Sequence, residues 1–307
     1  MRRSLDPNHA CSSPRACNGY TPAGTRSGVM YKSLLLPLVD RDGDADALDL
    51  AVRLAVLHGA HLSVLVMIDL PPPVVDPWGL MPDPVTAQSH ADLRERGSAR
   101  LAALRERLAA ETIDWEARTV EAMSMGAPRA ATRESYDCDL VVLGGAIGDT
   151  VESAVPREYF SSLLLEAGCP VLVVPPRCAA EVPTRCITIA WQPTREAARA
   201  VRAALPLLRA AKTVDVLAID DGKTPDAEPS GRRMIAYLRR HGVEASWVAR
   251  PAGEETVATR VLQFARHSRS QLLVVGGYGH SRLREWALGG VTRELLIGAD
   301  QPVLYAH

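Results

Sequence analysis

Short apolar runs alternate with longer amphipathic segments along most of this chain. From position 30 to the end, runs of strand length are followed by stretches in which apolar residues recur at helical spacing. Strands that alternate with helices predict a parallel sheet covered by helices on both faces. In the first half, the pattern predicts strands at 31–39, 61–68, 115–121, 139–145 and 170–175. Between and after them it predicts helices at 47–58, 90–110, 128–136 and 159–167.

The same order of elements is predicted again in the second half. Strands are expected there at 186–191, 214–219, 244–249, 272–277 and 302–305. Helices are expected at 194–211, 231–241, 255–267 and 293–297. The sequence therefore predicts an α/β fold of two tandem, open, doubly wound units, each built on a parallel five-stranded sheet.

Sequence offsets between the halves support a duplication. Asp40 corresponds to Gln192 at an offset of 152 residues, whereas two later pairs agree on 132. The difference of 20 residues is close to the length of a Pro-rich segment at 70–89, which only the first half contains and which we expect to be a surface excursion. The two pairs at the offset of 132 are Gly144 with Gly276 and Pro170 with Pro302.

Residues 1–29 differ from the rest of the chain. They are rich in Ser, Pro, Gly and Asn and show no apolar period, so we expect a flexible tail. Met30, where the character changes, is a candidate for the true start of translation. The repeated units are then expected at 30–176 and 185–307, with a linker near 176–184.

Length, composition and charge narrow the possible classes of protein. The 307 residues suggest two domains, and the 47% apolar and 23% charged residues argue against a disordered, collagenous or coiled-coil chain. A net charge of -1 offers no overall attraction to nucleic acid or to anionic membranes, so we expect neither as a partner. The chain contains neither an uninterrupted apolar run of membrane-spanning length nor the apolar core of a secretory signal, so we expect a cytoplasmic protein.

Candidate metal ligands and redox groups are few. The six cysteines form no Cys-x-x-Cys pair, so we expect buried or incidental thiols and no metal site. Cys138 and Cys169 each precede a predicted strand and could lie close together, but a cytosol would keep them reduced. For His58 and His61, packing or exposure is a more economical explanation than metal binding.

The segment after the fourth strand of the second half is the strongest candidate for a binding site. In an open parallel sheet, ligands bind beyond the carboxyl ends of the strands, where the strand order reverses. Residues 276–292 contain five glycines and lead into the predicted helix at 293–297. Bare backbone amides and a helix beginning suit a phosphate, although the same glycines could simply form turns. Positive charge at the rim would come from His280, Arg282, Arg284 and Arg293.

The spacing Gly276-x2-Gly279-x9-Gly289, followed by a small residue, resembles the phosphate loop of the universal stress protein family, in its ATP-binding branch. The five-strand repeat, the polar residue after the first strand, the Gly-Gly after the fourth and the Pro-Val-Leu of the fifth are also similar. The resemblance covers residues 30–307 as two tandem copies and implies the fold of the adenine nucleotide α-hydrolase-like proteins. It also implies a cofactor, which would be ATP or another adenine nucleotide, alone or with Mg²⁺.

The resemblance also implies a set of binding residues. The positions that contact adenine and ribose would be Ala190, Gln192 and Ala218. Those that contact phosphate would be Gly276, Gly279, Gly289, Gly290 and Val291. Two positions depart from the family: Gln192 stands where an aspartate is usual, and Gly290 where a Ser or Thr is usual. An amide can still hydrogen-bond a base or a ribose.

The first half lacks the glycine spacing. At the offset of 132, Ile147 replaces Gly279, while Arg157 and Glu158 replace the later glycines. Asp149, Glu152 and Glu158 would also oppose a polyphosphate by Coulomb repulsion. We therefore expect the first half to bind no nucleotide through this loop and to have a structural role.

Family members pair through their fifth strand, and such pairing would give the first half its structural role. The resemblance implies an intramolecular pseudo-dimer in which 170–174 lies antiparallel to 302–305, covering two open sheet edges. Whether whole chains pair further as a homodimer is left open.

Three classes of function remain. The first is a stress-response regulatory protein that binds an adenine nucleotide in its second half, with at most slow hydrolysis. The second is a tandem interaction module that binds no nucleotide. The third, an enzyme of adenylate chemistry, would need a Ser-Gly-Gly or His-x-Gly-His loop after the first strand, which Trp191 to Thr194 do not provide. No paired acid and base is visible, so we expect no catalytic residues. Tyr278 and Trp286 either pack over the loop or fill gaps, and packing is favoured.

Overall fold

The computed structural model describes residues 30–72, 84–123, 126–150, 153–178, 181–182, 184–220, 227–278 and 290–307. The tail predicted at 1–29, most of the Pro-rich segment, and the positions Gly279, His280, Arg282, Arg284, Trp286 and Gly289 lie outside these ranges. None of the helices within these ranges is both long enough and apolar enough to cross a membrane.

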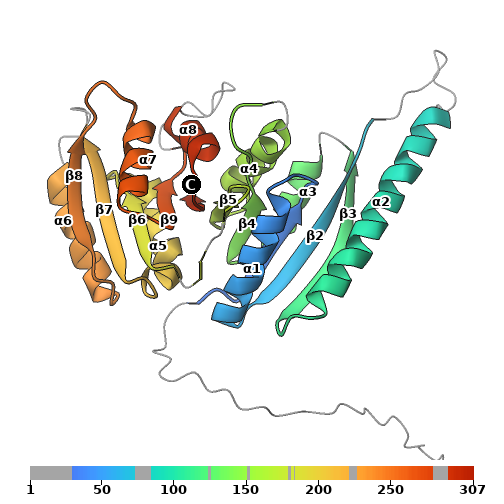
Figure 1. Cartoon of the computed structure of the whole chain (residues 1–307), viewed down its shortest axis with the longest axis horizontal. Coiled ribbons are helices and arrows are strands. Elements are labelled where there is room, and N and C mark those ends of the chain that lie inside the picture. Colours follow the sequence, from blue (N-terminus) through green and yellow to red (C-terminus); the bar gives the residue numbers. More distant parts are fainter. Residues whose placement is uncertain are drawn as a thin grey trace, which may run out of the picture.

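Ten strands and eight helices are found in the described residues, and they alternate except where the sixth strand directly follows the fifth (Figure 1). The strands are β1 (Ser33–Leu38), β2 (His61–Leu70), β3 (Asp114–Met123), β4 (Leu140–Gly144), β5 (Val171–Val174), β6 (Cys186–Ala190), β7 (Thr213–Asp220), β8 (Ser246–Pro251), β9 (Leu272–Gly276) and β10 (Val303–Ala306). The helices are α1 (Asp44–His58), α2 (Pro84–Leu108), α3 (Ala127–Arg133), α4 (Ala154–Glu166), α5 (Arg195–Leu208), α6 (Ala227–Arg240), α7 (Val257–His267) and α8 (Gly290–Gly298).

All ten strands form one sheet, in the order β3-β2-β1-β4-β5-β10-β9-β6-β7-β8. Neighbours within each half are parallel, and only the central pair β5 and β10 is antiparallel, with Leu172 opposite Leu304. The order reads the same from either edge when β6 to β10 are equated with β1 to β5. The predicted fold class is thus confirmed, and so is the antiparallel pairing of the two fifth strands.

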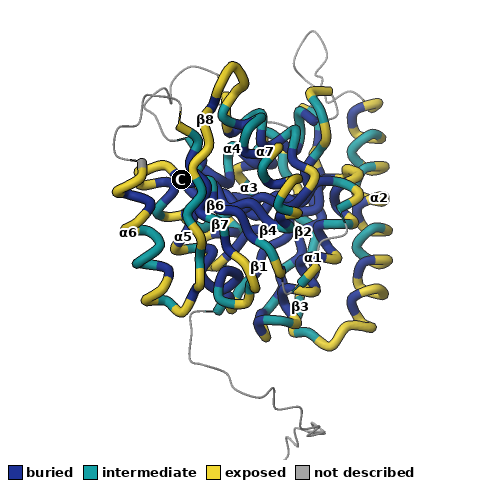
Figure 2. Tube along the Cα trace, turned by 60° about the vertical axis from the view of Figure 1, so that its left-hand side comes forward, coloured by how far each residue is buried: buried dark blue, intermediate teal, exposed yellow. Residues whose placement is uncertain are grey.

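Helices cover both faces of this sheet. Apolar side chains of α1, α2, α5 and α6 share one core cluster with the strands, and those of α3, α4, α7 and α8 share another. Along β1, Leu34 and Leu36 belong to the first cluster and Leu35 to the second, which explains why the strands read as continuous apolar runs. Figure 2 shows the buried strands in the centre, with exposed positions on the outer helices.

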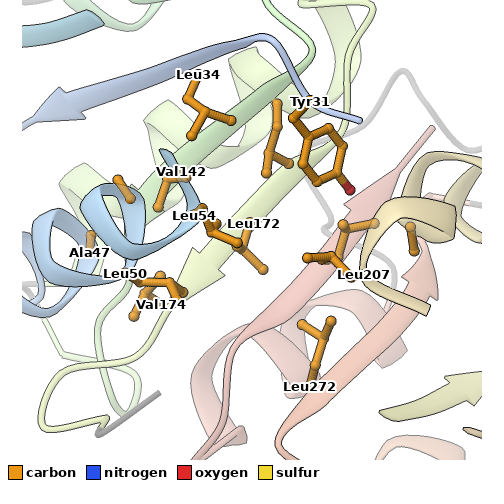
Figure 3. Packing of buried hydrophobic residues seen from close by; sticks show 14 of the residues in the cluster. Tyr31, Leu34, Ala47, Leu50, Leu54, Val142, Leu172, Val174, Leu207 and Leu272 are labelled. Atoms are coloured by element: carbon orange, nitrogen blue, oxygen red, sulfur yellow. The ribbon is translucent and has the colours of Figure 1, made fainter. Parts of the chain in front are cut away.

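Both core clusters continue from one half into the other. Tyr31, just before β1, donates a hydrogen bond from its hydroxyl to the carbonyl oxygen of Ala203 in α5, at 2.7 Å. Figure 3 shows its ring beside the first-half core and directed toward the helix that carries Leu207. The halves are therefore joined by side-chain packing as well as by strand pairing.

Several helices begin earlier than the sequence pattern predicts. α2 begins at Pro84 instead of 90, because proline is tolerated in the first turn of a helix, where its missing N–H has no partner to lose. α4 begins at Ala154 instead of 159, and α8 at Gly290 instead of 293. α2 has 25 residues and α6 has 14, so part of the extra length of the first half is helix rather than excursion.

Strand register corrects one predicted correspondence between the halves. Leu34 of β1 faces Leu140, whereas Ile187 of β6 faces Leu272, which sets the offset of these first strands at 153 instead of 152. Val39, and not Asp40, therefore corresponds to Gln192. The contacts of Gly144 with Asp44 and of Gly276 with Ala197 give the same offset of 153 for the helix starts that follow these strands.

Candidate functional site

The strand order of the second half reverses between β6 and β9, and the predicted site residues gather at the carboxyl ends of these strands. Ala190 ends β6 and pairs with Val275, the residue before Gly276, so these two strand ends are neighbours. Ala218 lies in the adjacent strand β7 and is buried, while Gln192, after β6, is exposed. The structure therefore brings Ala190, Ala218 and Gly276 to neighbouring strand ends. Whether they contact a base stays a prediction.

The beginning of α8 lies at the same edge of the sheet. Gly290 and Val291 open this helix and are both exposed. The backbone N–H of Tyr278, two residues after β9, donates to Oγ1 of Thr292 at 3.4 Å. This bond holds the first turn of α8 beside the end of β9. The free N–H groups and the dipole of a helix beginning can bind an anion at this point.

Gly276 has a structural reason to be glycine. A Cβ at this position would lie 2.5 Å from the backbone nitrogen of Ala197, because the first turn of α5 packs directly on the end of β9. Gly144 has the same environment in the first half, where its Cβ would lie 2.8 Å from the carbonyl carbon of Gly43. The resemblance implies a phosphate contact for Gly276, and the structure adds a close helix contact that both halves share.

Side chains fix the end of β6 and the start of α5. The indole N–H of Trp191 donates to Oγ of Ser230 in α6 at 3.1 Å, and both groups are buried. Thr194 caps α5 by accepting a hydrogen bond from the N–H of Ala197 at 3.2 Å. Burial alone would raise the pKa of Glu196, but hydrogen bonding to Arg195 outweighs it and lowers that pKa. The carboxylate of Glu196 is therefore charged near neutral pH.

Arg293, expected at the rim of the phosphate loop, forms an ion pair with Asp149 of the first half. Asp149 also accepts a hydrogen bond from Arg157 at 2.5 Å. Although desolvation would raise the pKa of Asp149, the two guanidinium groups lower it. The repulsive charge expected from Asp149 is therefore balanced by two cations. The sequence pattern could not predict this ion pair, because its two residues are 144 positions apart.

The corresponding crevice of the first half contains a carboxylate of its own. Oδ2 of Asp44, a buried residue, accepts hydrogen bonds from the N–H groups of Asp40 at 2.8 Å and Arg41 at 3.4 Å. Arg100 of α2 contacts Asp44 and Asp40, each at 3.3 Å. Burial raises the pKa of Asp44, against the opposing effect of these hydrogen bonds. The carboxylate of Asp44 thus accepts hydrogen bonds from the backbone N–H groups that follow β1.

Two hollows in the described part of the chain, and the arrangement of its potential metal ligands, bear on the predicted site. A cavity of about 10 Å³ lies between the halves, near Arg157 and Ile297, and is large enough for about one water. An open hollow of about 470 Å³ runs along α1 and includes none of the predicted nucleotide contacts. Within the described residues, no group of three or more His, Cys, Asp or Glu side chains is placed to hold a metal ion.

The thiols and histidines singled out earlier have ordinary surroundings. Burial raises the pKa of Cys138 to about 11 and that of Cys169 to about 12, so both remain protonated thiols near neutral pH. His58 is buried with its ring edge-on to Tyr31, at a centroid distance of 5.0 Å. His61 hydrogen-bonds to Asp114 at 2.9 Å.

Comparisons with known proteins agree with this architecture. A family model described as "Universal stress protein family" matches residues 30–175. A search of curated proteins finds no match. A universal stress protein from Archaeoglobus fulgidus DSM 4304 is similar in structure, with a TM-score of 0.70 and 14% sequence identity over 89% of this chain and 95% of its own. A functionally unknown protein from Pseudomonas aeruginosa PAO1 has a TM-score of 0.57 and 15% identity, over 90% of this chain and 92% of its own.

These structural similarities concern the fold of nearly the whole chain. Both alignments extend across the two halves, so the tandem arrangement is common to this chain and these structures. The family match covers the first half, whose loop lacks the glycine spacing. The second half repeats the strand order of the matched half.

Proposed function

Because this chain belongs to the universal stress protein family, we propose that its second half binds ATP or a related adenine nucleotide and that the protein regulates a stress response. The observation that carries the proposal is the position of α8. Its first turn, in which Gly290 and Val291 are exposed, lies beside the carboxyl end of β9, at the point where the strand order reverses. A phosphate there would meet free backbone N–H groups and the positive end of the helix dipole.

The distribution of charge supports the choice of the second half. Residues 185–307 contain 18 Lys and Arg against 12 Asp and Glu, a net charge of +6, whereas residues 30–176 contain 12 against 22, a net charge of -10. A nucleotide polyanion is therefore attracted to the second half and repelled by the first. The near-zero charge of the whole chain conceals this difference.

The residues near the site fit the parts of a nucleotide in a consistent order. Gln192 and the ends of β6 and β7 would face the base and ribose, and the first turn of α8 with Arg293 would face the phosphates. Mg²⁺, where present, would be held mainly by phosphate oxygens and water, since Mg²⁺ rarely takes an all-protein cage.

We also propose a cytoplasmic binding protein with no nucleic-acid or membrane partner, and with at most slow hydrolysis. The N-terminal half would serve as an intramolecular pseudo-dimer partner.

Isothermal titration calorimetry of the full chain with MgATP tests the proposal. We expect binding by the wild type, weakened about tenfold by Arg293→Gln, since a charge-assisted hydrogen bond contributes roughly 1.5–3 kcal/mol. Arg266→Gln is the matched control, because Arg266 lies at the far end of α7 and pairs with Asp300. No heat at millimolar nucleotide would favour the interaction module, and sustained turnover would favour an enzyme.

A further inference from the structure

Tyr278 has a backbone conformation that a tyrosine rarely adopts. Its φ is 56°, in the left-handed region, and its neighbours in the sequence are Gly277 and Gly279. A third glycine would accept this conformation without strain. A tyrosine at such a position is retained for what its side chain contacts, and backbone strain of this kind concentrates at functional sites.

The side chain of Tyr278 lies against α4 of the first half. Its hydroxyl is 3.3 Å from Oγ of Ser161, and its ring centroid is 6.4 Å from that of Phe160, which is fully buried. The preceding Gly277 approaches the same helix, because a Cβ on it would lie 2.6 Å from Cδ2 of Leu164. Burial raises the pKa of Tyr278, so its phenol remains a donor near neutral pH. Gly277 and Tyr278, which follow β9, therefore pack against α4 of the first half.

The backbone of Tyr278 links these contacts with α4 to the start of α8. Its N–H donates to Oγ1 of Thr292, a residue in the first turn of α8 that is itself buried. Gly279 and Gly289 of the glycine spacing lie between residues 278 and 292 in the sequence. The contact on α4 thus connects the end of β9 with the first turn of α8.

The internal repeat shows that this anchor exists on one side only. At the offset of 132, Ala146 corresponds to Tyr278, while Thr292 and Arg293 correspond to Phe160 and Ser161. Gly145, the counterpart of Gly277, would place a Cβ against Val173 of its own half, at 2.9 Å, instead of against the other half. On the other side of the pseudo-two-fold axis the junction is made by different contacts, the N–H of Gly148 donating to the carbonyl oxygen of Ile297 at 3.1 Å and the ion pair of Asp149 with Arg293. Ala146 cannot provide an aromatic anchor there, so the contact of Tyr278 is specific to the side on which the glycine-rich segment begins.

We propose that Tyr278 is a positioning residue for the phosphate groups of the bound nucleotide, which makes Phe160 and Ser161 of the first half part of the same functional unit. The inference rests on the proposed function. It assigns the first half a role beyond covering a sheet edge: the affinity of the second half for phosphate depends on α4.

Calorimetry of the full chain with ATP and with adenosine tests this role. Tyr278→Gly should weaken ATP binding at least tenfold, and Ser161→Ala and Tyr278→Phe about threefold each, since one neutral hydrogen bond is lost. Adenosine should bind equally well to all four proteins, because it has no phosphate to position. Recovery of most of the affinity in Tyr278→Phe relative to Tyr278→Gly would identify the ring as the main anchor. Tyr136→Gly is the matched control, since Tyr136 is 65% exposed.

Two outcomes would overturn the inference while the proposed function stands: ATP affinity unchanged in Tyr278→Gly, or equal losses for ATP and adenosine. Wild-type protein that binds neither ligand would refute the proposed function. Hydrogen exchange tests the anchoring of α8 by Tyr278 separately, without a ligand. Faster exchange of the α8 amides in Tyr278→Gly than in wild type supports the anchoring role, and identical exchange refutes it.

Discussion

Arg293, in the first turn of α8, forms an ion pair with Asp149, which lies in the other half of the chain just before α4. Both side chains are partly exposed, at 42% and 45%, so solvent screens their attraction. Arg157 also pairs with Asp149, at 2.5 Å, so this carboxylate remains neutralised when Arg293 turns elsewhere. The ion pair is therefore weak enough for a phosphate group to compete with Asp149 for Arg293.

Asp149→Asn should raise the affinity for ATP about threefold to tenfold. The substitution frees Arg293 and removes a negative charge near the phosphates, and the gain stays modest because solvent screens this exposed charge. Calorimetry at low and high salt measures it, and the gain should shrink as salt increases. Asp300→Asn, which releases Arg266 instead, is the control. A weaker affinity in Asp149→Asn would mean that Asp149 holds Arg293 in place for the ligand.

Gly276→Ala and Gly290→Ala should have opposite effects on stability. A Cβ at Gly276 would clash with the backbone of α5 at 2.5 Å, so we expect a loss of about 1–3 kcal/mol in the free energy of unfolding. At Gly290 the nearest atom would be 3.6 Å away, and alanine in a helix is favoured over glycine by up to about 1 kcal/mol. Urea denaturation without nucleotide measures both. Equal stability of the two variants would show that α5 can move away from β9.

The strands and the pairing of the halves could be predicted from the sequence because their signals are local. A run such as Val171–Val174 is apolar at every position since it is covered on both faces, and its repeat at Val303–Ala306 marks the second unit. The boundaries that were missed also have a local cause. The proline at the start of α2 resembles a helix breaker, and periodicity alone cannot tell a first turn from an excursion.

The site could be predicted only in outline. Glycine spacing pointed to the edge of the sheet where α8 begins, but spacing does not distinguish glycines that contact a ligand from Gly276, which contacts a helix. The partners of Tyr278 and Arg293 lie in the other half, more than a hundred residues away, and no periodicity encodes such contacts. The offset of 153 was missed because the polar side chains after the two first strands, Asp40 and Gln192, were aligned in place of the strands.

His58 should make the protein less stable as the pH falls from about 6.5 toward 4. Burial, with a smaller effect of Lys32, lowers its pKa from 6.5 to about 4. The unfolded chain binds a proton in this interval and the folded chain does not. The contribution of His58 is therefore complete above pH 6.5 and is lost by up to about 1.4 kcal/mol per pH unit below it.

His58→Phe, which keeps a ring against Tyr31, should flatten this part of the stability profile. Denaturant unfolding between pH 4 and 8 gives the comparison, with His267→Gln at an exposed position as the control. Parallel profiles for wild type and His58→Phe would show that His58 becomes protonated in the folded protein as readily as in the unfolded chain.

Tyr31→Phe should weaken the connection between the two halves by about 1 kcal/mol. The variant loses the hydroxyl that donates to Ala203 in α5 at 2.7 Å but keeps the buried ring. The cost should stay moderate, because the carbonyl of Ala203 lies inside a helix and retains its helical partner. Since the core clusters and the sheet continue across the junction, we expect one cooperative transition that moves as a whole to lower denaturant. Tyr136→Phe, at an exposed position, is the control. A split into two transitions would mean that the halves unfold separately and that Tyr31 contributes only to their contact.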